Sequence, residues 1–428
     1  GSRNIRRLHN LSEAIIIFDE VQKVPISSVS LFNSALNFLR GYGKSSIVLC
    51  TATQPALHYV EHKLEINADS EMIKGLDKVF HAFKRVNVVD CATDQTFSNE
   101  SLSHFVIEKM EKVRSILIIL NTRAVVRDLY EKLKDNIHDT AVYHLSTSMC
   151  PIHRNSILNK IRNDLVLGKR IICVSTQLIE AGVDVSFECV IRSLAGLDSI
   201  AQAAGRCNRH GEMAVKNVYV IDHEEEKLEK LIEIQKGKQI AKRILLDIKY
   251  NNENFGGDIL SKEALERYFH EFYLEFATDL NYFIPKIRKN MTDLLMVSRS
   301  ENSYRQAYIH KTGERDIPLF ILNSYGTAAE HFSVIDDFTT SVLVPYGEGK
   351  EIIAELNGNG RIEEMGKLLK MSQQIVVNLY KQEFDLLVEN GGVVSLLNGE
   401  IFALKDGAYN EEYGIDVQNE SGFSSAIF

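Results

Sequence analysis

The sequence has no surplus of basic residues. Its 428 residues include 49 Lys and Arg against 58 Asp and Glu, which gives a formal net charge of −9. This balance excludes a surface that attracts nucleic acid along the whole chain, so any such contact must come from a local groove. Tryptophan is also absent, and no functional conclusion follows from that. The hydrophobic content of 45% and charged content of 25% are ordinary for a globular protein.

The sequence lacks a C-x-x-C pair and any long apolar run. The six cysteines are Cys50, Cys91, Cys150, Cys173, Cys189 and Cys207. Several lie inside apolar segments, which predicts buried thiols in a reducing cytosol and argues against a disulfide framework or a zinc site. The longest apolar runs, such as Ala14–Phe18 and Ile116–Leu120, are too short to span a bilayer. No signal peptide is visible. We therefore expect a cytoplasmic protein without a membrane contact.

The sequence contains no match to G-x-x-x-x-G-K-[ST], the loop that cradles nucleotide phosphates. Gly43-Lys44-Ser45 looks like the end of such a loop, but Phe38 occupies the place of the first glycine. This segment also precedes a predicted strand instead of following one. The His138-Asp139 pair has no matching ligand spacing around it, so we predict no metal site there.

Two apolar runs near the start predict buried parallel strands over Ala14–Phe18 and Ser46–Cys50, with a helix over Ser30–Leu39 between them. The first run delivers Asp19 and Glu20 at its carboxyl end. Ligands bind at this end of the strands in open α/β sheets. Helix or turn capping by the two carboxylates is the alternative.

A third strand is predicted over Ile171–Val174, and S-T-Q follows at its carboxyl end. Further along, Gln202, Arg206 and Arg209 are four and three residues apart, which predicts one shared face of a helix. Two guanidiniums on one face suit a clamp for phosphate oxygens. A solvated helix face is the alternative. Gly205 lets a second backbone come close.

The order of these segments resembles a known family. A strand, S-T-Q, E-A-G-V-D, a second strand over Cys189–Arg192 and then Q-x-x-G-R-x-x-R resemble motifs five and six of superfamily-two helicases. More narrowly, they resemble the helicase part of the CRISPR-associated helicase–nuclease of type I interference. D-E-V-Q after the first strand resembles the Walker B motif, T-A-T after the second resembles motif three, and N-T-R at 121–123 resembles motif four.

The resemblance implies a nucleotide site. Asp19 would hold the magnesium ion bound to ATP, and Glu20 would orient and deprotonate the attacking water. Arg206 and Arg209 would act as arginine fingers on the γ-phosphate, with Gln202 beside them.

The resemblance also implies residues that couple the nucleotide to neighbouring motifs. Gln22, where many relatives have histidine, and Thr51 and Thr53 would serve this coupling. Motif five would link nucleic acid to nucleotide through Glu180, Gly182 and Asp184, with the last two at the nucleotide.

Five further residues would contact the sugar–phosphate backbone of a nucleic acid: Asn121, Thr122, Ser175, Thr176 and Gln177. Helix capping by Asn121 or Thr122 is the alternative. His144-Leu145-Ser146 and the basic stretch from Arg154 to Arg162 resemble another nucleic-acid-facing segment, and a solvated helix face is the alternative there.

The implied fold is α/β, with parallel sheets flanked by helices. We expect part of a first RecA-like lobe at 1–85, a complete second RecA-like lobe at 86–222, a helical linker at 223–300 with a break near Gly237, and an accessory α+β domain at 301–428. In the last domain, strands are predicted over Ser341–Tyr346 and Ile401–Leu404 and a helix over Arg361–Lys370.

The implied function is ATP-driven translocation along single-stranded DNA, feeding a nuclease in CRISPR antiviral interference. The implied cofactors are ATP and Mg²⁺, and the implied partners are single-stranded DNA and an RNA-guided surveillance complex. Since the phosphate loop is missing, we expect a fragment whose N-terminal helicase and nuclease part comes in cis or in trans, and negligible ATP hydrolysis by this chain alone. A different superfamily-two motor acting on RNA or DNA, and a non-catalytic docking module, are the alternatives.

Overall fold

The computed structural model describes residues 7–51, 53, 55–67, 69–75, 78–79, 82–298, 301–315, 324–334, 339–357 and 362–417. Its contacts group the chain into two compact units. One unit joins Gly1–Leu76 to Tyr250–Asp336, and the other joins Asp77–Lys249 to Asp337–Phe428. Each unit therefore combines segments that are far apart in the sequence. The four consecutive domains expected from the sequence stay a prediction.

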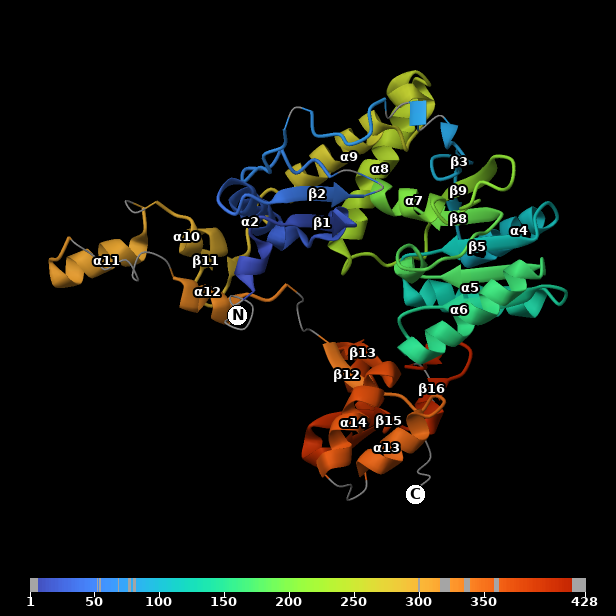
Figure 1. Cartoon of the computed structure of the whole chain (residues 1–428). Coiled ribbons are helices and arrows are strands. Elements are labelled where there is room, and N and C mark those ends of the chain that lie inside the picture. Colours follow the sequence, from blue (N-terminus) through green and yellow to red (C-terminus); the bar gives the residue numbers. More distant parts are fainter. Residues whose placement is uncertain are drawn as a thin grey trace. The chain divides into compact units, whose positions relative to one another are not determined.

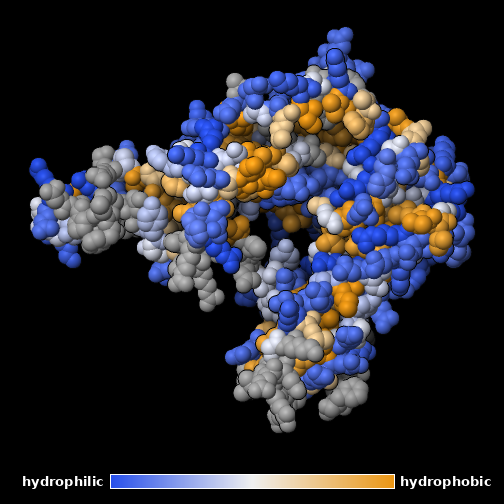
Figure 2. Space-filling model, viewed as in Figure 1, coloured by the Kyte–Doolittle hydropathy of each residue, from blue (hydrophilic) through white to orange (hydrophobic). Residues whose placement is uncertain are grey.

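The first unit contains a two-stranded parallel sheet of β1 (Ile15–Asp19) and β2 (Ser46–Cys50), connected by α2 (Val29–Gly41). Both predicted strands and the predicted helix are confirmed. Ile15 and Ile17 on β1 are 74% and 65% exposed, and Figure 2 shows apolar side chains at the surface over β1 and β2. Since parallel sheets are normally covered on both faces, one face of β1 lacks a cover among the described residues.

Short elements complete the first unit (Figure 1). They are α9 (Lys262–Glu275), β10 (Phe283–Ile284), β11 (Lys289–Asn290), α10 (Met291–Leu295), α11 (Ser303–Thr312) and α12 (Tyr325–His331). Ser261 caps α9 by accepting from the Ala264 amide. A small core that includes Met291 and Leu294 packs against Leu31 of α2.

The second unit contains a seven-stranded sheet in which every described pairing is parallel. The strand order is β3-β9-β8-β5-β7-β6, and β4 pairs with β9. The strands are β3 (Val86–Asp90), β4 (Thr96–Phe97), β5 (Ser115–Ile119), β6 (Ala141–Leu145), β7 (Ile171–Ser175), β8 (Cys189–Ser193) and β9 (Lys216–His223). The helices between them are α4 (Asn99–Met110), α5 (Arg123–Asn136), α6 (Pro151–Val166) and α7 (Leu197–Ala204). Every strand predicted from an apolar run in this region is confirmed.

The middle strands of the sheet are buried along their whole length. All residues of β5, β7 and β8 are buried. On α5, Val126, Leu129 and Leu133 pack with Ile116 and Ile118 of β5 in the main core. The buried strands therefore form a rigid support for the loops that follow the carboxyl ends of β5, β7 and β8.

The predicted break near Gly237 is wrong. Helix α8 (Ile232–Tyr250) runs without interruption through this glycine, which is buried. Leu228 and Leu231 lie before α8 begins.

The C-terminal segment of the second unit folds as a four-stranded sheet of order β13-β12-β15-β14. Its elements are β12 (Thr339–Leu343), α13 (Gly349–Asn357), α14 (Ile362–Ser372), β13 (Val376–Tyr380), α15 (Lys381–Glu389), β14 (Val393–Leu396), β15 (Ile401–Leu404), β16 (Tyr409–Asn410) and β17 (Gly414–Ile415). The two predicted strands and the predicted helix are present, although Arg361 lies outside the described residues. Cys150 from the parallel-sheet lobe belongs to the same hydrophobic core.

The hairpin of β16 and β17 fastens this segment to the lobe. The Ile415 amide donates to the Ser148 carbonyl at 2.9 Å, and the Tyr409 hydroxyl accepts from the Cys150 amide at 3.1 Å. The ring of His153 stacks on Tyr346 at 4.0 Å, and its Nδ1 lies 2.8 Å from the Tyr409 hydroxyl. Arg127 adds an ion pair to Asp416 at 2.9 Å. The interface is therefore a packed junction with specific polar contacts.

Replacing Gly414 with alanine should weaken this junction. Gly414 has φ +88°, and an added Cβ would lie 2.2 Å from the Ser148 carbonyl oxygen. Gly391→Ala is the matched control, because Gly391 has φ +70° with open space around it, so it incurs only the backbone strain of about 1–3 kcal/mol. We expect a larger drop in the urea-unfolding midpoint for Gly414→Ala. Equal midpoints in the two variants would contradict the docking geometry.

The stability of the junction should depend on pH. Burial lowers the pKa of His153 to about 4 and that of His144 to about 3. Both side chains are neutral above about pH 6.5 in either state, and only the unfolded chain takes up protons below it, so stability falls as pH drops from about 6.5 towards 4. Thermal unfolding across this range checks the prediction. His153→Phe should reduce the slope, whereas the exposed His138→Phe should leave it unchanged.

Candidate functional site

The first unit brings together four of the predicted site residues after β1 and β2. The Glu20 backbone is left-handed, with φ 52°, and its side chain accepts a hydrogen bond from the Gln22 amide. The carbonyl of the same Gln22 side chain accepts from the Thr51 hydroxyl. The Thr53 amide in turn donates to the Thr51 oxygen at 3.1 Å. Gln22 thus bridges the candidate base and the T-A-T turn, whose Ala52 lies outside the described residues.

Asp19 ends β1 and is exposed, and one of its carboxylate oxygens accepts from the Glu20 amide at 3.0 Å. Within the described part of the chain, no three His, Cys, Asp or Glu side chains gather as a metal cage. A single exposed carboxylate nevertheless fits Mg²⁺ in a nucleotide complex, because this ion keeps several waters and takes its other ligands from phosphates.

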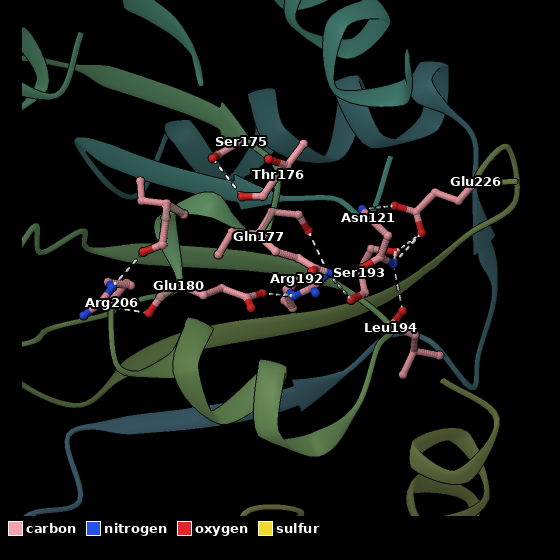
Figure 3. A network of polar contacts seen from close by, with 12 residues as sticks. Asn121, Ser175, Thr176, Gln177, Glu180, Arg192, Ser193, Leu194, Arg206 and Glu226 are labelled. Carbon is pink, nitrogen blue, oxygen red and sulfur yellow. Dashed lines mark hydrogen bonds and ion pairs between the residues drawn. The ribbon is translucent and has the colours of Figure 1, made fainter. Parts of the chain in front are cut away.

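In the second unit, parallel register brings the carboxyl ends of β5, β7 and β8 together. Ile119 lies opposite both Ser175 and Arg192, and Leu145 of β6 lies opposite Ser175. The loops that carry the predicted motifs four and five therefore start side by side (Figure 3). This proximity follows from sheet topology, since these segments are more than fifty residues apart in the chain.

Asn121 is buried and fully engaged within the protein. Its side-chain amide donates to the Leu194 carbonyl at 3.0 Å and to the Glu226 carboxylate at 2.7 Å. Its carbonyl accepts from Arg192 at 2.8 Å. These contacts occupy the side chain within the protein, and the predicted contact between Asn121 and nucleic acid stays a prediction. Glu226 and Arg192 were missed because neither belongs to a recognised motif.

Unlike the Asn121 side chain, the hydroxyls of Thr122 and Thr176 make no hydrogen bonds in the described structure. Both Oγ1 atoms are buried and have no hydrogen-bond partner in the described structure. Thr122 occupies the N-cap of α5 without making a capping bond, so the capping alternative is wrong for this residue. The Ser175 hydroxyl donates to the Thr176 carbonyl at 2.9 Å. The side-chain amide nitrogen of Gln177 lies 3.4 Å from the side-chain carbonyl oxygen of Asn121.

The prediction that Gln202, Arg206 and Arg209 share a helix face is wrong. Helix α7 ends at Ala204, so only Gln202 lies on it. The chain then runs beside Phe187: the Phe187 amide donates to the Arg206 carbonyl at 3.0 Å, and the Asn208 amide donates to the Phe187 carbonyl at 2.9 Å. These backbone bonds with a segment twenty residues away replace the helical ones.

The two arginines have separate environments. Arg206 is 7% exposed, and it donates to the backbone carbonyls of Ile179 at 2.9 Å and Glu180 at 2.5 Å. Arg209 is half-buried and forms an ion pair with the exposed Asp184 at 2.8 Å. Gly182, between the two acidic residues of E-A-G-V-D, has φ +71°. Predicted motifs five and six therefore contact each other directly.

The cysteines take no part in the site. All six are free thiols, four of them buried, whereas Cys50 and Cys91 are half-buried. Burial raises the pKa of Cys173, Cys189 and Cys207 to about 12. Thiols with such a raised pKa are poor nucleophiles and poor metal ligands, as the spacing of the cysteines predicts.

Comparison with known proteins supports the predicted resemblance. Residues 112–212 match the family described as CRISPR-associated nuclease/helicase Cas3, C-terminal. A putative CRISPR-associated nuclease/helicase Cas3 of Methanocaldococcus jannaschii is 23% identical over 66% of this chain and 36% of its own length. The resemblance to the CRISPR-associated helicase–nucleases is confirmed.

Two solved structures have a similar fold. T. fusca Cas3-ATP matches with a TM-score of 0.54 and 14% identity over 90% of this chain and 50% of that one. A chain of a CRISPR RNA-guided surveillance complex, pre-nicking, matches with a TM-score of 0.50 and 15% identity over 94% and 56%. These likenesses confirm the predicted α/β fold with RecA-like lobes.

The chain spans only part of its relatives. Matches cover between 8% and 36% of the curated relatives' own length. No described helix combines the length and the hydrophobicity that a membrane span requires.

Asn121→Ala should destabilise the protein, because it removes several buried hydrogen bonds, including one to the Glu226 carboxylate and one from Arg192. We expect a loss of about 1–3 kcal/mol in the free energy of unfolding. Thr122→Ala is the matched control: its hydroxyl makes no bond, so the change should stay within about 0.5 kcal/mol. Chemical denaturation of both variants checks this, and equal losses would refute the structural role of Asn121.

Proposed function

We propose that this chain supplies part of an ATP-dependent motor that moves along single-stranded DNA and works with a nuclease in CRISPR interference. The observation that carries the proposal is the meeting of predicted motifs four, five and six within one lobe, inside the segment that matches the helicase family. Arg206 of motif six donates to two backbone carbonyls of motif five. This contact supports the proposal that the two motifs move together during the ATPase cycle.

In this proposal, Asp19 holds Mg²⁺ with ATP, and Glu20 orients the attacking water. The bridge from Glu20 through Gln22 to Thr51 supports the coupling role of these residues. Many relatives have histidine at the position of Gln22. The Gln22 side chain can take the same coupling role, because its amide nitrogen donates to Glu20 and its carbonyl oxygen accepts from Thr51. Arg206 and Arg209 stabilise the charge that develops on the γ-phosphate, beside Gln202, Gly182 and Asp184.

The nucleic-acid contact is assigned to the carboxyl ends of β5 and β7. The unpartnered hydroxyls of Thr122 and Thr176 suit phosphate oxygens, because a buried hydroxyl without a partner costs free energy that a ligand can recover. Ser175 and Gln177 flank Thr176. Such contacts would position a strand without reading its sequence.

The chain by itself is expected to hydrolyse ATP negligibly, because it contains no phosphate loop. The uncovered face of β1, with Ile15 and Ile17 exposed, supports a further part of the first lobe that is supplied in cis or in trans. An RNA-guided surveillance complex is the proposed recruiting partner, since a chain of similar fold belongs to a complex of that kind.

The test measures ATP turnover of the complete gene product with single-stranded DNA and with RNA. DNA should stimulate turnover more strongly, and this chain alone should show almost none. Arg209→Ala should lower turnover by about 10³-fold or more without shifting the unfolding temperature, since its side chain is half-exposed. Arg170→Ala, at an exposed position in the same lobe, is the control. Unchanged turnover in Arg209→Ala would favour a docking module, and stimulation by RNA alone would favour a different motor.

A further inference from the structure

A fully buried arginine lies at the centre of the second lobe. Arg192, on β8, is 0% exposed, and its Nε lies 2.8 Å from the Glu180 carboxylate, which is buried as well. The rest of β8 is small or apolar, so sequence periodicity predicts a plain core strand. A buried ion pair is weak evidence for stability, because desolvating the two charges offsets most of their attraction. Stability alone therefore does not explain why this ion pair is buried at the centre of the lobe.

The guanidinium of Arg192 also holds the loop after β5. Its Nη1 donates to the Asn121 side-chain carbonyl at 2.8 Å and to the Ser193 backbone carbonyl at 2.8 Å. Asn121 is held in turn by Glu226, which also accepts from the Ser193 hydroxyl at 2.8 Å. One side chain thus fixes the starts of two loops that face the proposed site.

The other end of the network reaches motif six. Glu180, the ion-pair partner of Arg192, directly follows a short 3-10 helix, Gln177–Ile179. The backbone carbonyls of Ile179 and Glu180 are the acceptors that hold Arg206. Figure 3 shows the continuous path from Glu226 through Asn121, Arg192 and Glu180 to Arg206.

We infer that Arg192 is a positioning residue: through Glu180 it fixes the two carbonyls that aim Arg206. The inference rests on the proposed function, in which Arg206 acts on the γ-phosphate. Loss of Arg192 would remove the buried cation beside the Glu180 carboxylate, so the turn that carries both carbonyls would shift. The Arg206 guanidinium would then no longer be oriented towards the γ-phosphate, although no residue that contacts ATP had been replaced.

A double-mutant cycle in the complete gene product tests this inference, with ATP turnover, ADP affinity and thermal unfolding measured for each variant. Arg192→Met should lower kcat about tenfold or more and change the Kd for ADP by less than about threefold. Arg206→Ala should lower kcat further. The double variant should match Arg206→Ala within about threefold, because a displaced arginine and a missing one are equivalent.

A purely structural role for Arg192 would give a different result. The two losses would then multiply, and that outcome overturns the inference while the proposed function stands. Unchanged turnover in Arg206→Ala alone would overturn the proposed function and this inference together. The matched control is Asp222→Asn, which breaks the ion pairs of the buried Asp222 with Lys238 and Lys242 (2.6 Å each) in the same lobe, outside the network. It should lower the unfolding temperature and leave kcat unchanged.

If Arg192→Met fails to fold, a volume-matched pair decides the question. Arg192→Met combined with Glu180→Leu replaces the buried ion pair with apolar groups, which restores stability in such sites. The backbone carbonyl at 180 is retained. We expect the unfolding temperature to recover and kcat to stay low. Recovery of kcat together with stability would overturn the positioning role.

Discussion

The parallel register of β5, β7 and β8 is the constraint on which the second lobe depends. Three strands from separate parts of the chain end at one edge, so each polar loop that follows them starts next to the others. The strands are buried along their whole length, and burial of apolar surface holds this edge rigid. The candidate site is therefore a consequence of sheet order, and its residues need no proximity in sequence.

Polar residues at that edge divide into two groups with different physical roles. Hydrogen bonds and an ion pair join Asn121, Glu180, Arg192 and Glu226 inside the protein, and these contacts hold the loops that carry them. The hydroxyls of Thr122 and Thr176 lack partners in the described structure and suit a ligand. Arg206 connects the groups, because it is held by backbone carbonyls of motif five while belonging to motif six.

The C-terminal segment extends the same lobe. Cys150, at the start of α6, is shared with its core, and the Tyr409 hydroxyl connects the Cys150 amide to His153. Small strands such as β16 and β17 are marginal alone, so this docking contributes to their order. A neutral, buried His153 favours a junction that is firm near neutral pH.

Local patterns in the sequence determined the strands, helices such as α2, and the motif loops at strand ends, because period and apolar content act over a few residues. They did not determine where α7 ends: the spacing of Gln202, Arg206 and Arg209 fits a helix, but backbone bonds to Phe187 divert the chain after Ala204. Nor did they indicate Arg192, whose acidic partner Glu180 lies in a loop outside β8, or the burial of Asn121. Only the tertiary structure decided these features, since the cost of burying a polar group depends on partners that folding brings from elsewhere.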